Sequence, residues 1–158
     1  MSSLCFINID ALKISSVHPV WLNLHNKLNI RKAHVVAKLL FQRYPLSGSH
    51  TSGKARSSKC VLCKSDSETV AHFLLHSTSL KSGRDPFLPR ILLYTKRHAL
   101  DINPENLVAM VPDNNNIPDH VGDDRPECTK LCRDFIFKLH NYRLLLLGGR
   151  SEYQLTAN

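Results

Sequence analysis

The sequence predicts a mostly α-helical protein: a small helical domain around a Cys/His knuckle, with an irregular N-terminal lead-in and loops. Apolar residues recur at helical spacing in three segments, residues 26–43, 85–98 and 126–147. Between the first two segments lies the stretch KCVLCKSDSETVAHFLLHST, whose cysteines and histidines are spaced like metal ligands. Helices gathered around a short metal-binding turn are therefore the expected architecture.

The first predicted helix, residues 26–43, has two faces of different character. Its apolar face repeats with helical period and consists of Leu28, Val35, Val36, Leu39 and Leu40. A narrow cationic stripe lies roughly opposite and consists of Lys27, Arg31, His34 and Lys38. This stripe is either a solvated surface or a binding face. Tyr44-Pro45 ends the helix, because the residue before a proline is driven out of the α region.

Two shorter helices are expected in the middle of the chain. Residues 69–80 predict the first of them, and Ser82-Gly83 is expected to break it. The second extends to about residue 98, with Asp85 as the candidate N-cap and Pro86 in its first turn. Pro89 is unfavourable inside a helix, so it favours a later start.

The last predicted helix, residues 126–147, has the strongest core pattern. Its apolar stripe repeats at spacings of four and three and consists of Cys128, Cys132, Phe135, Leu139, Tyr142 and Leu146. Gly148-Gly149 stops this helix. The chain therefore divides into a lead-in, a helix with the knuckle and a following helix, a loose linker, and a C-terminal helix with a tail. These parts are residues 1–25, 26–100, 101–125 and 126–158.

The positive charge is concentrated in the front of the chain. The net charge is +8 at pH 7, and residues 1–100 hold 15 Lys and Arg against 4 Asp and Glu, whereas residues 101–158 hold 6 against 9. A basic half of this kind suits a phosphate backbone, because bound Lys and Arg release its condensed counterions. The candidate nucleic-acid contacts are Lys27, Arg31, Lys38, Lys54, Arg56 and Lys59. Solubility alone is the competing interpretation.

The Cys/His stretch has the spacing C-x2-C-x8-H-x3-H. Cys60 and Cys63 bracket a tight turn that can present two thiolates to one ion. His72 and His76 are separated by four residues, so both imidazoles point the same way if this segment is α-helical. Four such ligands form a closed, structural zinc site with no position left for a substrate. The alternative is two buried cysteines with both histidines on a helix surface.

The segments FQRYPLSG, KCVLCKSDSETVAHFLLHSTSL and RDPFLPRIL resemble the zinc-knuckle region C-terminal to the polymerase of animal non-LTR retrotransposon reverse transcriptases. The Arg-Tyr-Pro-Leu, Cys-x-Leu-Cys, Glu-Thr-Val-x-His-Phe-Leu-Leu and Arg-x-Pro-Phe motifs carry this resemblance. The tail FIFKLHNYRLLLLGGRSEYQ is similar to the end of such proteins. The resemblance implies a fragment without the polymerase core that binds RNA or DNA.

The resemblance also implies a Cys, Cys, His, Cys ligand set. Its four positions in this chain are Cys60, Cys63, His72 and Ser77. A serine hydroxyl is a poor zinc ligand, so His76 is the expected replacement at the fourth position. A water as the fourth ligand and an empty site are the alternatives.

No catalytic residue is predicted. A polymerase needs paired carboxylates, usually on an aromatic-x-Asp-Asp turn, to hold two metal ions. Asp123-Asp124 lacks both the aromatic residue and the flanking apolar strands. Cys128 and Cys132 have helical spacing, which favours core packing over a redox pair. Phe73 and Tyr44 are candidates for stacking on bases, but core packing is favoured for both.

Location and partners are predicted only in outline. No apolar run approaches the length of a membrane span, and the chain start lacks the pattern of a secretory signal. A nuclear or cytoplasmic protein is therefore expected, and its odd number of cysteines fits a disulfide framework poorly. Two other interpretations stay open: a protein-interaction module that docks through the apolar C-terminal helix around Leu144–Leu147, and a non-functional relic of a transposable element.

Overall fold

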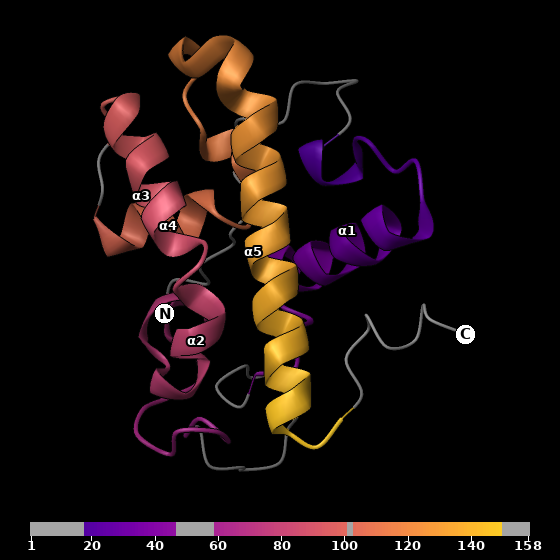
Figure 1. The fold of residues 1–158 in the computed structure, drawn as a ribbon, viewed down its shortest axis with the longest axis vertical. Helices are drawn as coiled ribbons and strands as arrows, with labels where there is room; N and C mark the ends of the chain where they lie inside the picture. Colours follow the sequence, from indigo (N-terminus) through magenta and orange to yellow (C-terminus); the bar gives the residue numbers. More distant parts are fainter. Residues whose placement is uncertain (1–17, 47–58, 101–102, 150–158) are drawn as a thin grey trace.

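The computed structural model describes residues 18–46, 59–100 and 103–149, and the chain within these ranges is mostly α-helical (Figure 1). The α-helices are α1 (Lys27–Leu40), α2 (Lys81–Arg84), α3 (Leu88–Arg97), α4 (Pro104–Met110) and α5 (Arg125–Leu146). Shorter turns are η2 (Pro19–Trp21), η3 (His72–His76), η4 (Thr78–Leu80), η5 (Asn114–Asn116) and η6 (Asp119–Asp124). These ranges contain no strand, and their one isolated β-bridge joins Lys59 to Ser67. The predicted fold class is confirmed.

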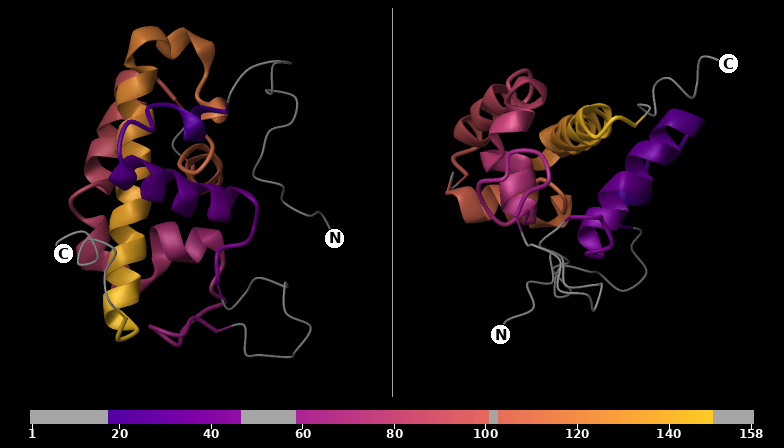
Figure 2. Two further views of the ribbon diagram at one scale, coloured as in Figure 1. Left: turned by 90° about the vertical axis from the view of Figure 1, so that its right-hand side faces the viewer. Right: turned by 90° about the horizontal axis from the view of Figure 1, so that it is seen from below.

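Helix α5 is the axis of the molecule. It has α1 on one side and α2, α3 and α4 on the other (Figures 1 and 2). The predicted stripe explains this position for most of its length, because Cys128, Cys132, Phe135 and Leu139 are all fully buried. Its last two members are not: Tyr142 is half-buried and Leu146 is 45% exposed. Gly148 follows the helix end with a φ of 77°, as the stop signal predicts. Within the described part of the chain, neither α5 nor another helix has the length and apolarity of a membrane span.

Helix α1 crosses α5 at a steep angle and buries its predicted apolar face against it (Figure 1). The side chain of Asn26 caps its first turn by accepting a 2.9 Å hydrogen bond from the amide of Asn29. Lys32 lies beside the buried face and forms a 2.6 Å ion pair with Asp134 of α5. Lys32 therefore differs from Lys27 and Lys38 of the same helix, whose side chains are exposed.

The predicted helix over residues 69–80 forms in part: residues 70–71 are α-helical, the π-helical turn η3 continues them, and a 3-10 turn follows. In η3 the carbonyl of His72 accepts a 2.8 Å hydrogen bond from the amide of Ser77, five residues later. The 3-10 turn η4 follows and leads directly into α2. Further along, α3 begins at Leu88 with Pro89 in its first turn, which confirms the later start that Pro89 favours.

Gly83 does not break a helix, contrary to the sequence-based expectation. It lies within α2, at the point where this short helix approaches α5. A Cβ atom at this position would lie 3.2 Å from Cδ1 of Tyr142 and 3.3 Å from Cδ2 of Leu139. The glycine therefore permits close helix packing, a role that a local sequence pattern does not distinguish from a stop signal.

Residues 101–125, predicted as a loose linker, are largely part of the packed fold. Their buried apolar side chains include Leu107, Val111, Ile117 and Val121. Two of the Asn and Asp residues in this segment, Asn103 and Asp113, act as local caps. The Asn103 side chain accepts a 2.8 Å bond from the amide of Asn106 at the start of α4. Short capped turns can thus pack well despite a loop-like composition.

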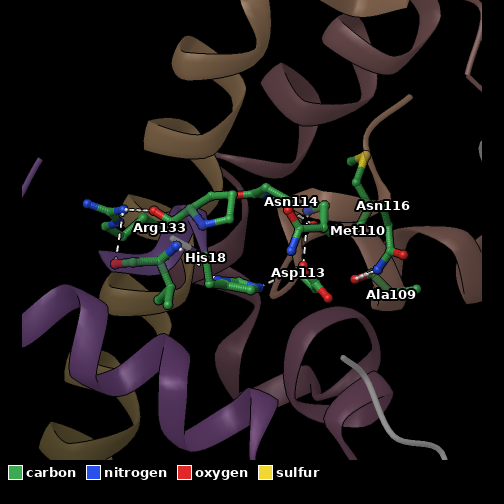
Figure 3. A network of polar contacts seen from close by, with 10 residues as sticks. His18, Ala109, Met110, Asp113, Asn114, Asn116 and Arg133 are labelled. Atoms are coloured by element: carbon green, nitrogen blue, oxygen red, sulfur yellow. Dashed lines mark hydrogen bonds and ion pairs between the residues drawn. The ribbon is translucent and has the colours of Figure 1, made fainter. Parts of the chain in front are cut away.

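The end of the N-terminal lead-in is fixed by polar contacts (Figure 3). His18 Nε2 lies 3.0 Å from the fully buried Asp113 carboxylate, in the turn after α4. Arg133 of α5 donates hydrogen bonds of 3.0 and 3.1 Å to the carbonyls of Pro19 and Leu22. These contacts tie η2 to α5 and to the segment around η5, while residues 1–17 lie outside the described ranges.

Candidate metal centre

Cys60 and Cys63 lie on a tight turn, as their spacing predicts. The carbonyl of Cys60 accepts a 3.0 Å hydrogen bond from the amide of Lys64, and the amide of Cys60 donates a 2.7 Å bond to the carbonyl of Asp66. Lys64 has a φ of 60°, so the chain reverses immediately after Cys63. The turn holds the two cysteines close together before the chain reaches η3.

His72 completes a group of three ligand atoms with the two cysteines. The Sγ atoms of Cys60 and Cys63 and a ring nitrogen of His72 all lie within 4.8 Å of one another. His72 Nε2 is 3.2 Å from Cys63 Sγ. Ligand atoms of a tetrahedral zinc ion lie about 3.5–3.8 Å apart, given Zn–S and Zn–N bonds of about 2.3 and 2.0 Å. Two thiolates and one imidazole also form a donor set that zinc prefers, so this group fits a zinc ion.

The ionisation of Cys63 favours metal binding. Burial raises the pKa of its thiol, but hydrogen bonds from the side chain and backbone of Ser65, and from Cys60 and His72, together lower that pKa to about 6. The Ser65 Oγ atom lies 3.0 Å from the Cys63 sulfur. Because the thiolate is the form that binds metals, most of Cys63 is in the competent state at neutral pH.

His76 does not join this group. Its side chain is exposed, and its ring nitrogens are not part of the three-residue cluster around His72. The prediction assumed an α-helical turn, in which residues four apart are neighbours. In the π-helical turn observed here, only His72 is buried beside Cys63, whereas His76 is the last residue of η3 and is exposed. The structure therefore brings together three of the four predicted ligands.

Ser77 occupies the position that the resemblance assigns to the fourth ligand. Its side chain is fully buried, and its Oγ atom has no hydrogen-bond partner among the described residues. The carbonyl of Ser77 accepts a 2.8 Å bond from Arg84, which fixes the backbone there. A buried hydroxyl without a partner normally requires an explanation, and a water or an ion close by would supply one.

A buried ion pair between Glu68 and Arg143 contacts the cluster through Cys60. Glu68 accepts hydrogen bonds from Arg143 of α5 at 3.0 Å and 3.2 Å, one to each carboxylate oxygen. Cys60 Sγ donates to the same carboxylate at 3.8 Å. Arg143 also donates a 3.1 Å bond to the carbonyl of Pro45, beyond the end of α1. The knuckle is thus joined to α5 and to the segment after α1 through one guanidinium.

Aromatic residues pack next to this ion pair. The Tyr44 ring lies 5.2 Å from the Phe73 ring, and its hydroxyl is 2.8 Å from Nδ1 of His140. Arg143 lies over the Tyr44 ring at 5.9 Å. Tyr44 and Phe73 are 3% and 0% exposed, so both are core residues, as favoured, and neither can stack on a base.

Sequence reasoning missed Glu68 and Arg143 as site residues. Glu68 begins the Glu-Thr-Val-x-His motif that carries the resemblance, and the motif implies no role for this glutamate. Arg143 follows Leu139 by four residues and thus falls on the buried side of α5. A charged residue on an apolar stripe requires a buried partner, and this signal was available in the sequence.

The predicted basic contacts lie at different places. Lys27 and Lys38 are exposed on α1, and Arg31 is half-buried on the same face. Lys59 is exposed directly before the first cysteine ligand. The remaining two, Lys54 and Arg56, lie outside the described residues.

Comparison with family models, with curated proteins and with solved structures finds no match to this chain. The resemblance to retrotransposon reverse transcriptases therefore stays a prediction that depends on the sequence motifs. The Cys60, Cys63 and His72 cluster does not depend on this resemblance, because it is defined by the distances between its ligand atoms.

Proposed function

We propose that the chain is a non-catalytic nucleic-acid-binding module whose helical fold is held together by a zinc ion. The observation that carries this proposal is the convergence of Cys60, Cys63 and His72 within 4.8 Å. The sequence motifs add a resemblance to the C-terminal region of a retrotransposon reverse transcriptase.

A structural role for the metal follows from where its ligands lie. Zinc bound to Cys60, Cys63 and His72 would crosslink residues 59–80, the described part of the chain before α2, where the helical elements are short. The unfolded chain has no preformed site, so binding energy becomes folding energy. Ser77 would supply the fourth ligand, directly or through a water, since its buried Oγ atom has no hydrogen-bond partner among the described residues.

Nucleic acid is the partner that the charge distribution favours. Helix α1 contains no acidic residue and carries Lys27, Arg31 and Lys38 away from its buried face. Lys59 places a further cation beside the knuckle. Phosphate groups of RNA or DNA complement such a surface. Residues 101–158 carry more acidic than basic residues and are not part of the proposed contact surface.

Zinc content of the purified protein tests the metal site. We expect about one zinc ion per chain, lost in Cys63→Ser and retained in the matched control His76→Ala. Loss of zinc in His76→Ala would contradict the three-residue site described above. Absence of zinc from the native protein after dialysis against the metal would refute the structural role.

Filter binding at increasing salt tests the nucleic-acid role. Affinity for an oligonucleotide should fall steeply between about 50 and 200 mM salt, because each phosphate contact releases a counterion. Binding without salt dependence would exclude the phosphate contacts proposed here.

A second candidate function is docking of a protein partner by the end of α5. Leu145, Leu146 and Leu147 are 45–46% exposed there, and three adjacent exposed leucines are unusual for a monomer surface. If this end binds a partner or a second copy, Leu145→Glu/Leu146→Glu should lower an apparent mass measured by light scattering.

A further inference from the structure

The C-terminal end of α1 leaves a phenyl ring in solvent. Phe41 caps the helix and is 56% exposed. The next residue, Gln42, has a φ of 55°, and its amide donates a 3.1 Å bond to the carbonyl of Leu39. The amide of Arg43 donates a 2.7 Å bond to the carbonyl of Lys38. These two bonds are those of a Schellman helix end, in which the chain turns sharply away.

This helix end departs from the usual motif in two ways. Glycine is the usual residue at the left-handed position, because a side chain is strained there, and here it is Gln42. The residues that normally make a hydrophobic contact across the motif are Lys38 and Arg43. The backbone of the turn thus joins two exposed basic residues close to the exposed Phe41.

The helix dipole explains only part of this arrangement. Cations are favoured near a helix C-terminus, which accounts for Lys38 and Arg43 in electrostatic terms. It does not account for a large apolar ring left open to water beside them. Burial against the core would stabilise a phenyl ring, so its exposure has to be explained separately.

Phe41 also continues the cationic face of α1. Residues separated by three, four, seven and eleven positions share one side of a helix. Lys27, Ile30, His34, Lys38 and Phe41 follow this spacing, and all five are exposed. Together they form a strip about 21 Å long, given a rise of about 1.5 Å per residue. The strip therefore carries two lysines and a histidine, with Ile30 between them and an aromatic ring at its end.

We propose that this strip binds single-stranded nucleic acid, with one base stacked on Phe41 and the adjacent phosphates held by Lys38 and Arg43. The inference rests on the proposed nucleic-acid function and specifies its substrate class. In a duplex the bases stack on one another and cannot reach a protein ring, whereas bases of a single strand can turn outward. Every base has a π-face, so the contact tolerates different sequences.

Fluorescence anisotropy with labelled oligonucleotides of about 20 nucleotides tests the inference, using oligo(dT), oligo(U) and a mixed-sequence duplex at one salt concentration. Phe41→Ala should lower single-strand affinity about tenfold, because stacking contributes about 1–3 kcal/mol per base, and should leave duplex affinity within about twofold. Phe41→Trp, which keeps an aromatic ring, should retain the single-strand affinity of the native protein. The two single-strand arms show whether RNA or DNA is preferred.

Two matched variants separate stacking from general effects. Leu93 on α3 is 59% exposed, so Leu93→Ala removes a similar exposed apolar group from another element and should change neither affinity. Phe41→Trp in a Trp21→Phe background carries a single indole, since Trp21 is the chain's one tryptophan. Single-stranded oligonucleotide should quench that indole, and duplex should not.

The outcomes distinguish this inference from the proposed function. If the native protein binds oligonucleotides and Phe41→Ala binds them equally well, or loses single-strand and duplex binding equally, the stacking role is refuted while the general function stands. If the native protein binds no oligonucleotide even at low salt, both are refuted. Self-association that Phe41→Ala abolishes would identify the ring as a protein contact and also overturn the inference.

Discussion

The guanidinium of Arg143 holds the carboxylate of Glu68 through two hydrogen bonds, 3.0 Å from Nε to Oε1 and 3.2 Å from Nη2 to Oε2. Both side chains are almost completely buried, although they are 75 residues apart in the sequence. One partner lies eight residues after Cys60 and the other near the end of α5. This pair is therefore a buried polar connection between the candidate metal centre and α5.

Removal of one partner should be costly. Arg143→Met leaves the Glu68 carboxylate buried without a counter-charge, and losses of this kind reach about 3–5 kcal/mol in the free energy of unfolding. Urea unfolding followed by circular dichroism measures it. The double variant Glu68→Gln/Arg143→Met should recover part of the loss, because it removes the uncompensated charge. Equal stability of single and double variants would argue against a coupled pair.

The fourth zinc position gives a second prediction. Ser77→Cys places a thiolate on the residue whose amide contacts His72, and should raise zinc affinity at least about tenfold, because thiolate is a much better zinc ligand than a hydroxyl or water. Competition with a chromophoric chelator measures the affinity. Thr78→Cys adds a thiol at the next, exposed position and should have little effect. Equal gains in both variants would place the fourth ligand elsewhere.

The lowered pKa of Cys63 predicts the pH dependence of its reactivity in the zinc-free protein. The thiolate reacts with iodoacetamide and the thiol does not. With a pKa of about 6, half of Cys63 is ionised at about pH 6, so its alkylation rate should fall below that pH and level off above about pH 7. A cysteine of ordinary pKa, about 8.5, would continue to gain rate up to about pH 9.

Peptide mapping by mass spectrometry assigns the rate to Cys63 itself. Zinc should protect this residue, and Cys63→Ser should remove the fast phase. Ser65→Ala deletes the hydroxyl 3.0 Å from the sulfur and should move the midpoint to higher pH. An unchanged midpoint in Ser65→Ala would show that this hydrogen bond does not control the ionisation.

The sequence was sufficient for features that depend on long periodic patterns. The stripe from Cys128 to Leu139 predicted the buried face of α5, and C-x-x-C spacing with His72 predicted the cluster. Features that depend on tertiary packing were not predictable in the same way. Gly83 looked like a stop signal because local composition does not show that Tyr142 lies 3.2 Å from its missing Cβ. The exposure of His76 was not predictable either, because the spacing of two histidines does not show which of them packs against the cysteine turn.

The packing of Gly83 against α5 gives a further prediction. Gly83→Val adds atoms where a single Cβ already lies 3.2–3.3 Å from two side chains, and overpacking of this kind costs about 1–3 kcal/mol. Thermal and urea unfolding measure the loss. Ser82→Val, on the neighbouring exposed position of α2, is the matched control and should change stability by less than about 0.5 kcal/mol. Similar losses in both variants would point to helix propensity rather than packing.

Mutation of Lys32 should change the stability of the protein, whereas mutation of Lys38 on the same helix should change its oligonucleotide binding. Lys32 forms a partly buried 2.6 Å ion pair with Asp134, whereas Lys38 is exposed on the strip proposed to contact phosphates. Lys32→Met should lower the free energy of unfolding by about 1 kcal/mol and leave the salt dependence of oligonucleotide binding unchanged. Lys38→Met should leave stability within about 0.5 kcal/mol and reduce the slope of log affinity against log salt by about 1. Because both variants remove one positive charge from the same helix, equal effects on binding would show that only net charge matters and that the strip is not a defined contact surface.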